Sequence, residues 1–176
     1  VPTVALTVTP GTSVCQGENV TFTASPFTPG ATYEWYVNGV LQVPTGPFFS
    51  TTTLNNSDIV QVFATSAAGC TGPASTASAQ IQVFPLPSVN ITASANPICA
   101  GQSVTFTPSA TNAGASPQFQ WFVNGVFAGN GPTFVTSTLL NGDAVTCLAT
   151  SSSTGCPGTL SAPVVITVSP APTATI

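Results

Sequence analysis

The sequence contains no lysine, arginine or histidine, and its four acidic residues give a net charge of −4 over 176 residues. Proteins that bind nucleic acids use cations to displace the counterions of the phosphate backbone, so a nucleic-acid partner is excluded. Attraction to an anionic membrane surface is excluded for the same reason. Enzymes that need histidine as a base, lysine as a nucleophile or arginine as an anion clamp are excluded as well. Trypsin-like proteases find no cleavage site in such a chain.

Long apolar runs and clustered carboxylates are also missing. No hydrophobic run approaches the roughly 20 residues that cross a bilayer, so we expect no membrane insertion. A catalytic carboxylate pair or a calcium site needs several carboxylates close together, and here they are few and scattered. The sequence therefore predicts no catalytic residue, no metal ligand, no cofactor and no enzymatic activity. Asp58 and Asp143 are predicted to cap turns by accepting hydrogen bonds from backbone N–H groups.

One motif is present twice. In the first copy its landmarks are Cys15, Trp35, Asn38-Gly39, Asp58 and Cys70. In the second copy, about 85 residues later, the same landmarks are Cys99, Trp121, Asn124-Gly125, Asp143 and Cys156. This tandem duplication predicts two modules, 1–85 and 86–170. Residues 171–176 repeat the start of a module, and we expect them to begin the first strand of a further module in a longer array.

Apolar and polar residues alternate along both copies with the period of two that marks half-buried strands, and no stretch predicts a helix. The predicted strands are 4–9, 20–24, 32–37, 48–54, 59–65 and 79–84, then 89–94, 104–107, 118–123, 133–140, 144–150 and 164–168. Each Asn-Gly pair predicts a type I′ hairpin turn, because both residues tolerate positive φ. The fold predicted is all-β, with two tandem immunoglobulin-like β-sandwich modules, and Trp35 and Trp121 fill their cores.

Four of the five cysteines recur at matching positions and predict disulfides in an oxidising, extracellular location: Cys15, Cys70, Cys99 and Cys156. One pairing joins Cys15 to Cys70 and Cys99 to Cys156 within the modules. The other joins Cys15 to Cys156 across the junction and leaves Cys70 and Cys99 for neighbouring modules or subunits. The second has a geometric motive, because the ends of a sandwich lie about 23 Å apart and a disulfide needs Cα atoms within about 7 Å. Both pairings stay open at this point.

The fifth cysteine, Cys147, aligns with Val62 and shares the strand face of Val145 and Ala149. We predict that it is a buried free thiol that packs as a small hydrophobic residue.

The repeated pattern Cys-x-Gly-x-x-Val-Thr-Phe-Thr, followed by Trp-x-Val-Asn-Gly and Gly-Cys, resembles a known repeat class. It is similar to the tandem Ig-like and PKD-like repeats of giant cell-surface adhesins of gliding bacteria, which the type IX secretion route exports. This resemblance implies an extracellular location at the cell surface and a stalk, adhesion or filament role. The function expected is a structural stalk or filament segment that provides reach, stiffness and protease resistance. Its partners would be neighbouring modules of the same chain, or identical subunits arranged head to tail.

The alternative is a carbohydrate-binding accessory module. Tyr36 and Phe122 hold the same outward-facing position in the two copies. A repeated exposed aromatic can stack on a surface glycan or pack against a neighbouring chain. Coverage by an adjacent strand or loop is the competing interpretation of the same pair.

Overall fold

The computed structural model describes residues 3–25, 30–43, 45–65 and 75–170, and the regular elements within these ranges are β-strands. The chain divides into two compact units, Val1–Phe84 and Pro85–Ile176. Within the described ranges, no helix offers the length and apolarity needed to cross a membrane. Cys70 and residues 171–176, on which two of the predictions rest, lie outside the described residues.

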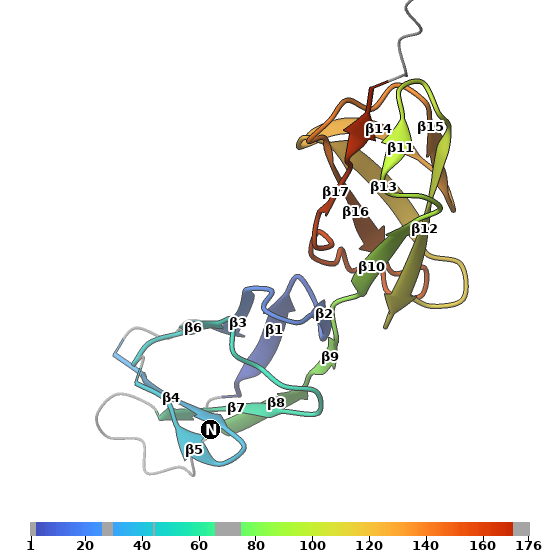
Figure 1. Cartoon of the computed structure of the whole chain (residues 1–176). Coiled ribbons are helices and arrows are strands. Elements are labelled where there is room, and N and C mark those ends of the chain that lie inside the picture. The colour runs from blue at the N-terminus through green and yellow to red at the C-terminus, as the bar shows by residue number, and fades with distance from the viewer. Residues whose placement is uncertain (1–2, 26–29, 44, 66–74, 171–176) are drawn as a thin grey trace, which may run out of the picture. The chain divides into compact units, whose positions relative to one another are not determined.

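The first unit is a sandwich of two antiparallel sheets (Figure 1). One sheet has the order β1-β3-β6, with bounds Ala5–Thr9, Val20–Ser25 and Phe48–Thr51. The other has the order β5-β4-β7-β8, with bounds Val40–Leu41, Thr32–Val37, Ile59–Thr65 and Ser75–Gln80. A short parallel pair completes the unit, formed by β2 (Ser13–Cys15) and β9 (Gln82–Phe84).

The second unit repeats this strand order. Its first sheet is β10-β12-β15, with bounds Ser88–Ala93, Val104–Thr111 and Phe134–Thr136. Its second sheet is β14-β13-β16-β17, with bounds Val126–Asn130, Gln118–Val123, Ala144–Thr150 and Val164–Val165. The parallel pair here is β11 (Ile98–Cys99) with β18 (Val168–Ser169). The predicted all-β fold with two tandem immunoglobulin-like sandwiches is confirmed.

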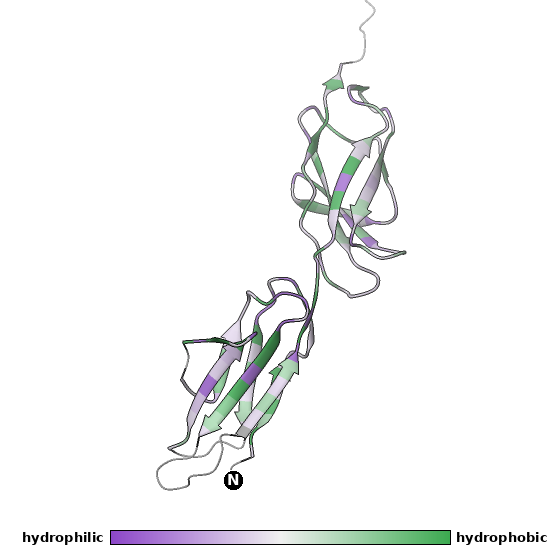
Figure 2. Cartoon of the chain, turned by 90° about the horizontal axis from the view of Figure 1, so that it is seen from below, coloured by the Kyte–Doolittle hydropathy of each residue, from purple (hydrophilic) through white to green (hydrophobic). Residues whose placement is uncertain are grey.

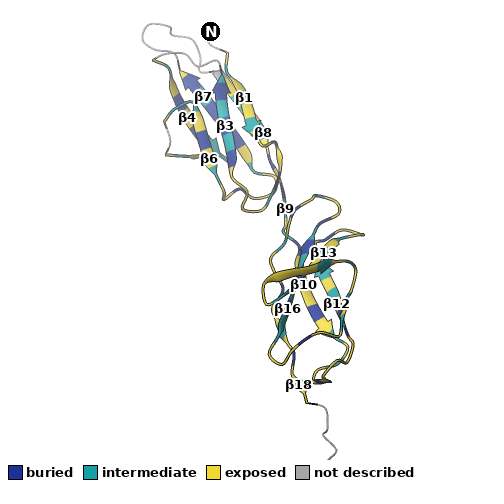
Figure 3. Cartoon of the chain, turned by 90° about the horizontal axis from the view of Figure 1, so that it is seen from above, coloured by how far each residue is buried: buried dark blue, intermediate teal, exposed yellow. Residues whose placement is uncertain are grey.

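Alternating burial explains why these segments form strands with one face inward. In β7, Val60, Val62 and Ala64 are buried, while their neighbours are half-buried or exposed. Figure 3 shows the resulting bands of buried and exposed residues along the strands, and Figure 2 shows the matching bands of hydropathy. Because successive side chains of a strand point to opposite faces, this pattern forces the apolar face of each sheet into the space between the sheets.

Each core is built around one tryptophan. Trp35 has no exposed surface, and its ring centroid lies 6.3 Å from that of Phe22 and 5.8 Å from that of Phe49. Its indole N–H donates a hydrogen bond to the Gly46 carbonyl at 2.8 Å, so the buried polar group is satisfied. Trp121 repeats the arrangement with Phe106, Phe134 and the Gly131 carbonyl. The predicted central position of both tryptophans is confirmed.

The Asn-Gly turns also have the predicted geometry. The φ angles are 51° and 79° at Asn38 and Gly39, and 53° and 77° at Asn124 and Gly125. Type I′ turns need positive φ at both central residues, which asparagine and glycine adopt at low cost. These turns join β4 to β5 and β13 to β14.

The last strand of each module was predicted as one continuous element, but the structure divides it into two short strands. In the first unit it pairs with β7 as far as Gln80 and then, after Ile81, pairs with β2 instead. Ile81 is fully buried, and its N–H donates to the Asp58 carbonyl at 2.8 Å, which ends the first pairing. The short strands β2 and β11 were not predicted, and Cys15 lies in β2. Strands β6 and β15 are shorter than predicted.

Candidate functional site

The carboxylate of Asp58 holds two turns of the first module together. Its Oδ2 accepts the backbone N–H of Asn55 at 2.8 Å, and its Oδ1 accepts Nδ2 of Asn38 at 2.7 Å. The side-chain oxygen of Asn38 in turn accepts the N–H of Ile59 at 2.9 Å. The Asn-Gly hairpin turn is thereby tied to the turn before β7. The predicted turn-capping role of Asp58 is confirmed.

The second module repeats this network around Asp143. Its carboxylate accepts the N–H of Leu140 at 2.8 Å and Nδ2 of Asn124 at 2.8 Å, and Asn124 Oδ1 accepts the N–H of Ala144. The bond from Leu140, and secondly the bond from Asn124, lower the pKa of Asp143, because they stabilise its charged form. Sequence reasoning predicted the two asparagines as turn residues but missed their hydrogen bonds to the aspartates. The available signal was their recurrence 20 and 19 residues before an aspartate in the two copies.

The two glutamates also accept hydrogen bonds from groups of the first module. Glu18 Oε2 accepts the backbone N–H of Cys15 at 2.9 Å. Glu34 Oε2 accepts the hydroxyl of Tyr36 at 3.0 Å, and this bond raises the pKa of Tyr36. Each of the four carboxylates of the chain therefore accepts a hydrogen bond from its own module. Among the described residues, no three cysteine, aspartate or glutamate side chains gather as a metal site would need.

The cysteines that the structure describes fall into two states. Cys15 and Cys156 are disulfide-bonded, whereas Cys99 and Cys147 carry free thiols. The pairing of Cys99 with Cys156 that the sequence left open is therefore wrong, because Cys99 is an exposed thiol in β11. Cys147 has no exposed surface, and burial raises its pKa to about 11, since desolvation disfavours the thiolate.

The aromatic pair Tyr36 and Phe122 faces outward, but both rings are half-buried by neighbours. The Tyr36 ring lies edge-on to Phe63 with 5.1 Å between ring centroids. The Phe122 ring lies edge-on to Phe127 at 6.0 Å, and Phe127 itself is 54% exposed. The two positions thus have different neighbours, an aromatic of β7 in the first copy and an aromatic of β14 in the second.

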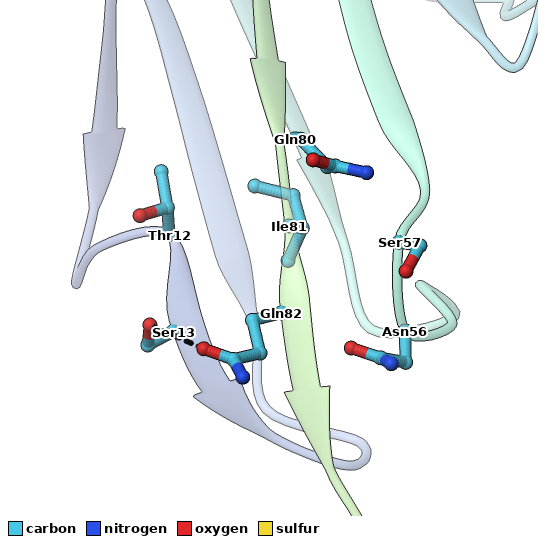
Figure 4. Close-up of a pocket in the computed structure, with 7 residues that line it drawn as sticks. All are labelled: Thr12, Ser13, Asn56, Ser57, Gln80, Ile81 and Gln82. Atoms are coloured by element: carbon cyan, nitrogen blue, oxygen red, sulfur yellow. Dashed lines mark hydrogen bonds between the residues drawn. The ribbon is translucent and has the colours of Figure 1, made fainter.

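A polar pocket of about 360 Å³ lies beside β2 and β9 of the first unit (Figure 4). Ser13 Oγ donates to Gln82 Oε1 at 3.4 Å, and Asn56 Oδ1 accepts the N–H of Val83 at 3.1 Å. The lining residues are amides, hydroxyls and one isoleucine: Thr12, Ser13, Asn56, Ser57, Gln80, Ile81 and Gln82. Such a lining offers hydrogen bonds, but neither a charge nor an aromatic ring for stacking.

The second copy has Asn96 where the first has Thr12. Asn96 Nδ2 donates to the Val165 carbonyl at 2.8 Å, and its Oδ1 accepts the N–H of Thr167 at 2.9 Å. The longer side chain therefore bonds directly to the last strand at the position where Thr12 leaves the pocket open. The lining of the pocket therefore differs between the two copies, at this position and also where Gln80 is matched by Val165.

The geometry defines tandem immunoglobulin-like modules, a class whose members are typically structural or binding modules. Residues 2–85 match the model of the family described as "Ig-like domain CHU_C associated", so the first module is an Ig-like domain. The second module has the same strand order and the same landmark residues. No curated protein matches the sequence.

Several solved structures resemble the chain in fold at low sequence identity. The full ectodomain of mouse nectin-like molecule 4 is 17% identical, with a TM-score of 0.40, and the match covers 98% of this chain and 66% of that one. The fibronectin(III)-like modules of Clostridium thermocellum CbhA are 13% identical, with a TM-score of 0.43 and coverages of 93% and 95%. Murine CEACAM1b is 13% identical, with a TM-score of 0.44 and coverages of 94% and 99%.

Proposed function

We propose that this chain is a segment of the extracellular stalk of a bacterial cell-surface adhesin, and that it supplies reach, stiffness and protease resistance. The proposal rests on one observation: each of the four carboxylates accepts a hydrogen bond from a group in its own module. In a chain without basic residues or histidine, these are the charged side chains with which a site would work. Here Glu18, Asp58 and Asp143 stabilise turns, and Glu34 binds a side chain of its own strand.

The repeat supports the same role. The two modules share their strand order, tryptophan cores, Asn-Gly turns and aspartate networks. A stalk gains length from copies of one stable unit, since each copy needs only its own core. The repeat motif resembles those of giant adhesins of gliding bacteria, and the disulfides favour an oxidising extracellular location. Neighbouring modules, or identical subunits arranged head to tail, are the proposed partners.

A length-matched replacement in the parent adhesin tests the stalk role. Cells would carry the adhesin with this segment deleted, or with the segment replaced by two unrelated Ig-like modules of the same length. We expect deletion to weaken surface attachment and the replacement to restore it, because a stalk contributes distance and not recognition. Loss of attachment in both strains would contradict the proposal.

A carbohydrate-binding role is the second candidate, and the surface around Tyr36 favours it. The Tyr36 hydroxyl and the Glu34 carboxylate lie 3.0 Å apart beside the Phe63 ring, which places polar groups next to an aromatic surface. Glycan-array binding by the purified chain tests this candidate. Binding that Tyr36→Ala abolishes would support it, with Phe122→Ala as the matched variant in the second module. An array without bound glycans would contradict it.

A further inference from the structure

Four asparagines of the chain are followed directly by glycine, and all four are exposed to water: Asn38, Asn124, Asn130 and Asn141. We infer that Asn130 is a site of spontaneous modification, at which water converts the side-chain amide to a carboxylate, and that hydrogen bonds protect the other three amides from this reaction. The inference concerns the chemical lifetime of the chain and does not depend on the adhesin role.

Asparagine before glycine is reactive because glycine has no Cβ to shield its backbone nitrogen. That nitrogen, once deprotonated, attacks Cγ of the asparagine side chain. A new C–N bond forms, the bond from Cγ to Nδ2 breaks, and Nδ2 takes up a proton and leaves as ammonia. Water then adds to one carbonyl of the resulting cyclic imide and opens the ring. The product is aspartate, or isoaspartate when the main chain continues through Cγ, and water is the co-reactant.

The amides of Asn38 and Asn124 are held at both ends. Nδ2 of Asn38 donates to Asp58 at 2.7 Å, and its Oδ1 accepts the N–H of Ile59 at 2.9 Å. Asn124 makes the same two bonds, to Asp143 at 2.8 Å and from a backbone N–H at 2.9 Å. The reaction moves Cγ toward the glycine nitrogen and expels Nδ2, so both bonds must break. One of them ends on a carboxylate, and hydrogen bonds to charged groups are the stronger kind.

Asn141 is also restrained by two hydrogen bonds. Its Oδ1 accepts the N–H of Val168 at 3.0 Å. The attacking nitrogen is that of Gly142, whose N–H donates to the Ile166 carbonyl at 2.9 Å. Both the amide and the attacking group are therefore engaged.

Asn130 is the least restrained of the four. It is the last residue of β14, the edge strand of its sheet, and within the part of the chain that the structure describes its side-chain amide has no hydrogen-bond partner. Its neighbours Gly129 and Gly131 have no side chains to crowd it, and even a Cβ at Gly129 would meet nothing within 4 Å. The bond that opposes the reaction runs from the Gly131 N–H to the Phe119 carbonyl at 3.2 Å, the long end of the usual range.

The first module has a threonine at the equivalent position. The Gly131 carbonyl accepts the indole N–H of Trp121 at 3.0 Å, and the Gly46 carbonyl does the same for Trp35 at 2.8 Å. The residue before Gly46 is Thr45, which has no amide to lose. Isoaspartate before Gly131 would insert a carbon into the main chain next to the carbonyl that binds the core tryptophan. We therefore expect the modification to weaken the second module and to spare the first.

Labelling with heavy-oxygen water tests the site. The folded chain would be incubated at pH 8 in this water, so that each conversion leaves a labelled oxygen in the new carboxylate, then digested with pepsin in acid and analysed by mass spectrometry. We expect label at Asn130 to accumulate about fivefold faster than at the other three asparagines, because one fewer hydrogen bond of about 1 kcal/mol opposes the attack. Equal rates, or faster labelling at another of the four, would overturn the inference.

Two controls separate the fold from the local sequence. In guanidinium chloride the hydrogen bonds are absent, so all four asparagines should be labelled at similar rates, and an unchanged lead of Asn130 would show that the fold is not the cause. The Asn130→Thr variant gives the second module the residue of the first. After the same incubation, hydrogen exchange in β13 and β16 should be faster in the parent and unchanged in Asn130→Thr. Equal acceleration in both chains would overturn the predicted effect on the second module.

Asp143→Ala and Asp58→Ala test the protection reciprocally. Asp143→Ala should speed labelling at Asn124 about tenfold and leave Asn38 unchanged, since a hydrogen bond to a charged group contributes about 1.5 kcal/mol. Asp58→Ala should do the opposite. Asn130 is the internal reference, because unfolding of the second module would raise its labelling together with that of Asn124. An unchanged rate at Asn124 in Asp143→Ala, or an equal rise at Asn130, would overturn the protective role of the network.

Discussion

The last strand of the sandwich is regular in the first module and broken in the second. Strand β8 pairs with β7 over six residues, from Ser75 to Gln80, whereas β17 pairs with β16 over two. The second copy has Pro157 and Pro163 in this region. Proline lacks the N–H that a sheet ladder needs, so a strand interrupted by prolines cannot pair continuously.

The backbone of β16 is nevertheless satisfied by other means. Gly158 and Ser161 donate their N–H groups to the carbonyls of Ala149 and Cys147, both at 2.8 Å. The Ser161 hydroxyl accepts the N–H of Cys147 at 3.0 Å. Buried backbone groups need partners, but the partner need not be a regular strand. The comparison shows that the core and the turns determine this fold, while the edge can be rebuilt.

The largest difference in stability between the two modules is expected when a core aromatic is removed from one of them. Phe22→Ala should destabilise the first module by about 3–5 kcal/mol, because it removes a fully buried ring beside Trp35 and leaves a cavity. Hydrogen exchange with peptide resolution would measure each module separately. We expect faster exchange in β3, β4 and β7, and unchanged exchange in β13 and β16.

The matched variant is Phe106→Ala, whose ring is equally buried beside Trp121. It should reverse the pattern, so that exchange rises in the second module and stays unchanged in the first. Equal loss of protection in both modules from either variant would show that the two cores unfold as one unit, contrary to the separate clusters of buried residues.

Most of the fold could be predicted from the sequence because the patterns that determine it involve residues close together in the chain. The alternation in 59–65 and 144–150 predicts β7 and β16 with their observed bounds, and the Asn-Gly pairs predict both hairpin turns. Strands β2 and β11 have three and two residues, too few for a period of two to be visible. They form because the last strand changes partner after Ile81, and a switch of this kind depends on tertiary structure.

A substitution in the irregular edge tests how tightly the second module is packed there. Gly158→Ala should destabilise it by about 1–3 kcal/mol, since the new Cβ meets the carbonyls of Pro87 and Ala149, which are backbone atoms that cannot move aside easily. Gly46→Ala is the matched control, because a Cβ there meets nothing within 4 Å. Urea unfolding of both variants would measure the difference. Equal midpoints for the two variants would contradict the close contact.

Removal of a turn network should have a smaller effect that depends on pH. Asp143→Ala should cost about 1 kcal/mol at pH 7, because it removes two exposed hydrogen bonds. The folded pKa of Asp143 is lowered, so its contribution is present above the unfolded value of about 3.9 and is lost as pH falls through the folded value. Urea midpoints of variant and parent should therefore converge at low pH. A difference that persists in acid would show that the carboxylate charge is not the cause.

The candidate sites were harder to predict than the fold because they depend on side chains far apart in sequence. The capping by Asp58 and Asp143 follows from residue type, but the role of Asn38 requires β4 and β7 to lie side by side. The polar pocket is lined by residues that are far apart in sequence, from Thr12 to Gln82. The state of each cysteine depends on whether a partner is within reach, and residue type alone carries no information on that distance.

The smallest effect is expected where the two cores differ by one side chain. Val62 pairs with Trp35 in the first module, and Cys147 pairs with Trp121 in the second. Both side chains are fully buried, so Cys147→Val exchanges one small hydrophobic residue for another and should change the stability at pH 7 by less than about 1 kcal/mol.

A difference in stability between Cys147→Val and the parent should appear at alkaline pH. The pKa of Cys147 is raised to about 11, above an unfolded value of about 8.5, so the thiol contributes stability that is lost as pH rises from the lower to the higher value. Urea midpoints from pH 7 to pH 10 should therefore fall less steeply for Cys147→Val than for the parent. In iodoacetamide at pH 8, Cys99 should react in the folded protein and Cys147 only after unfolding, because Cys99 is exposed. Parallel midpoints together with rapid labelling of Cys147 would place this thiol outside the core.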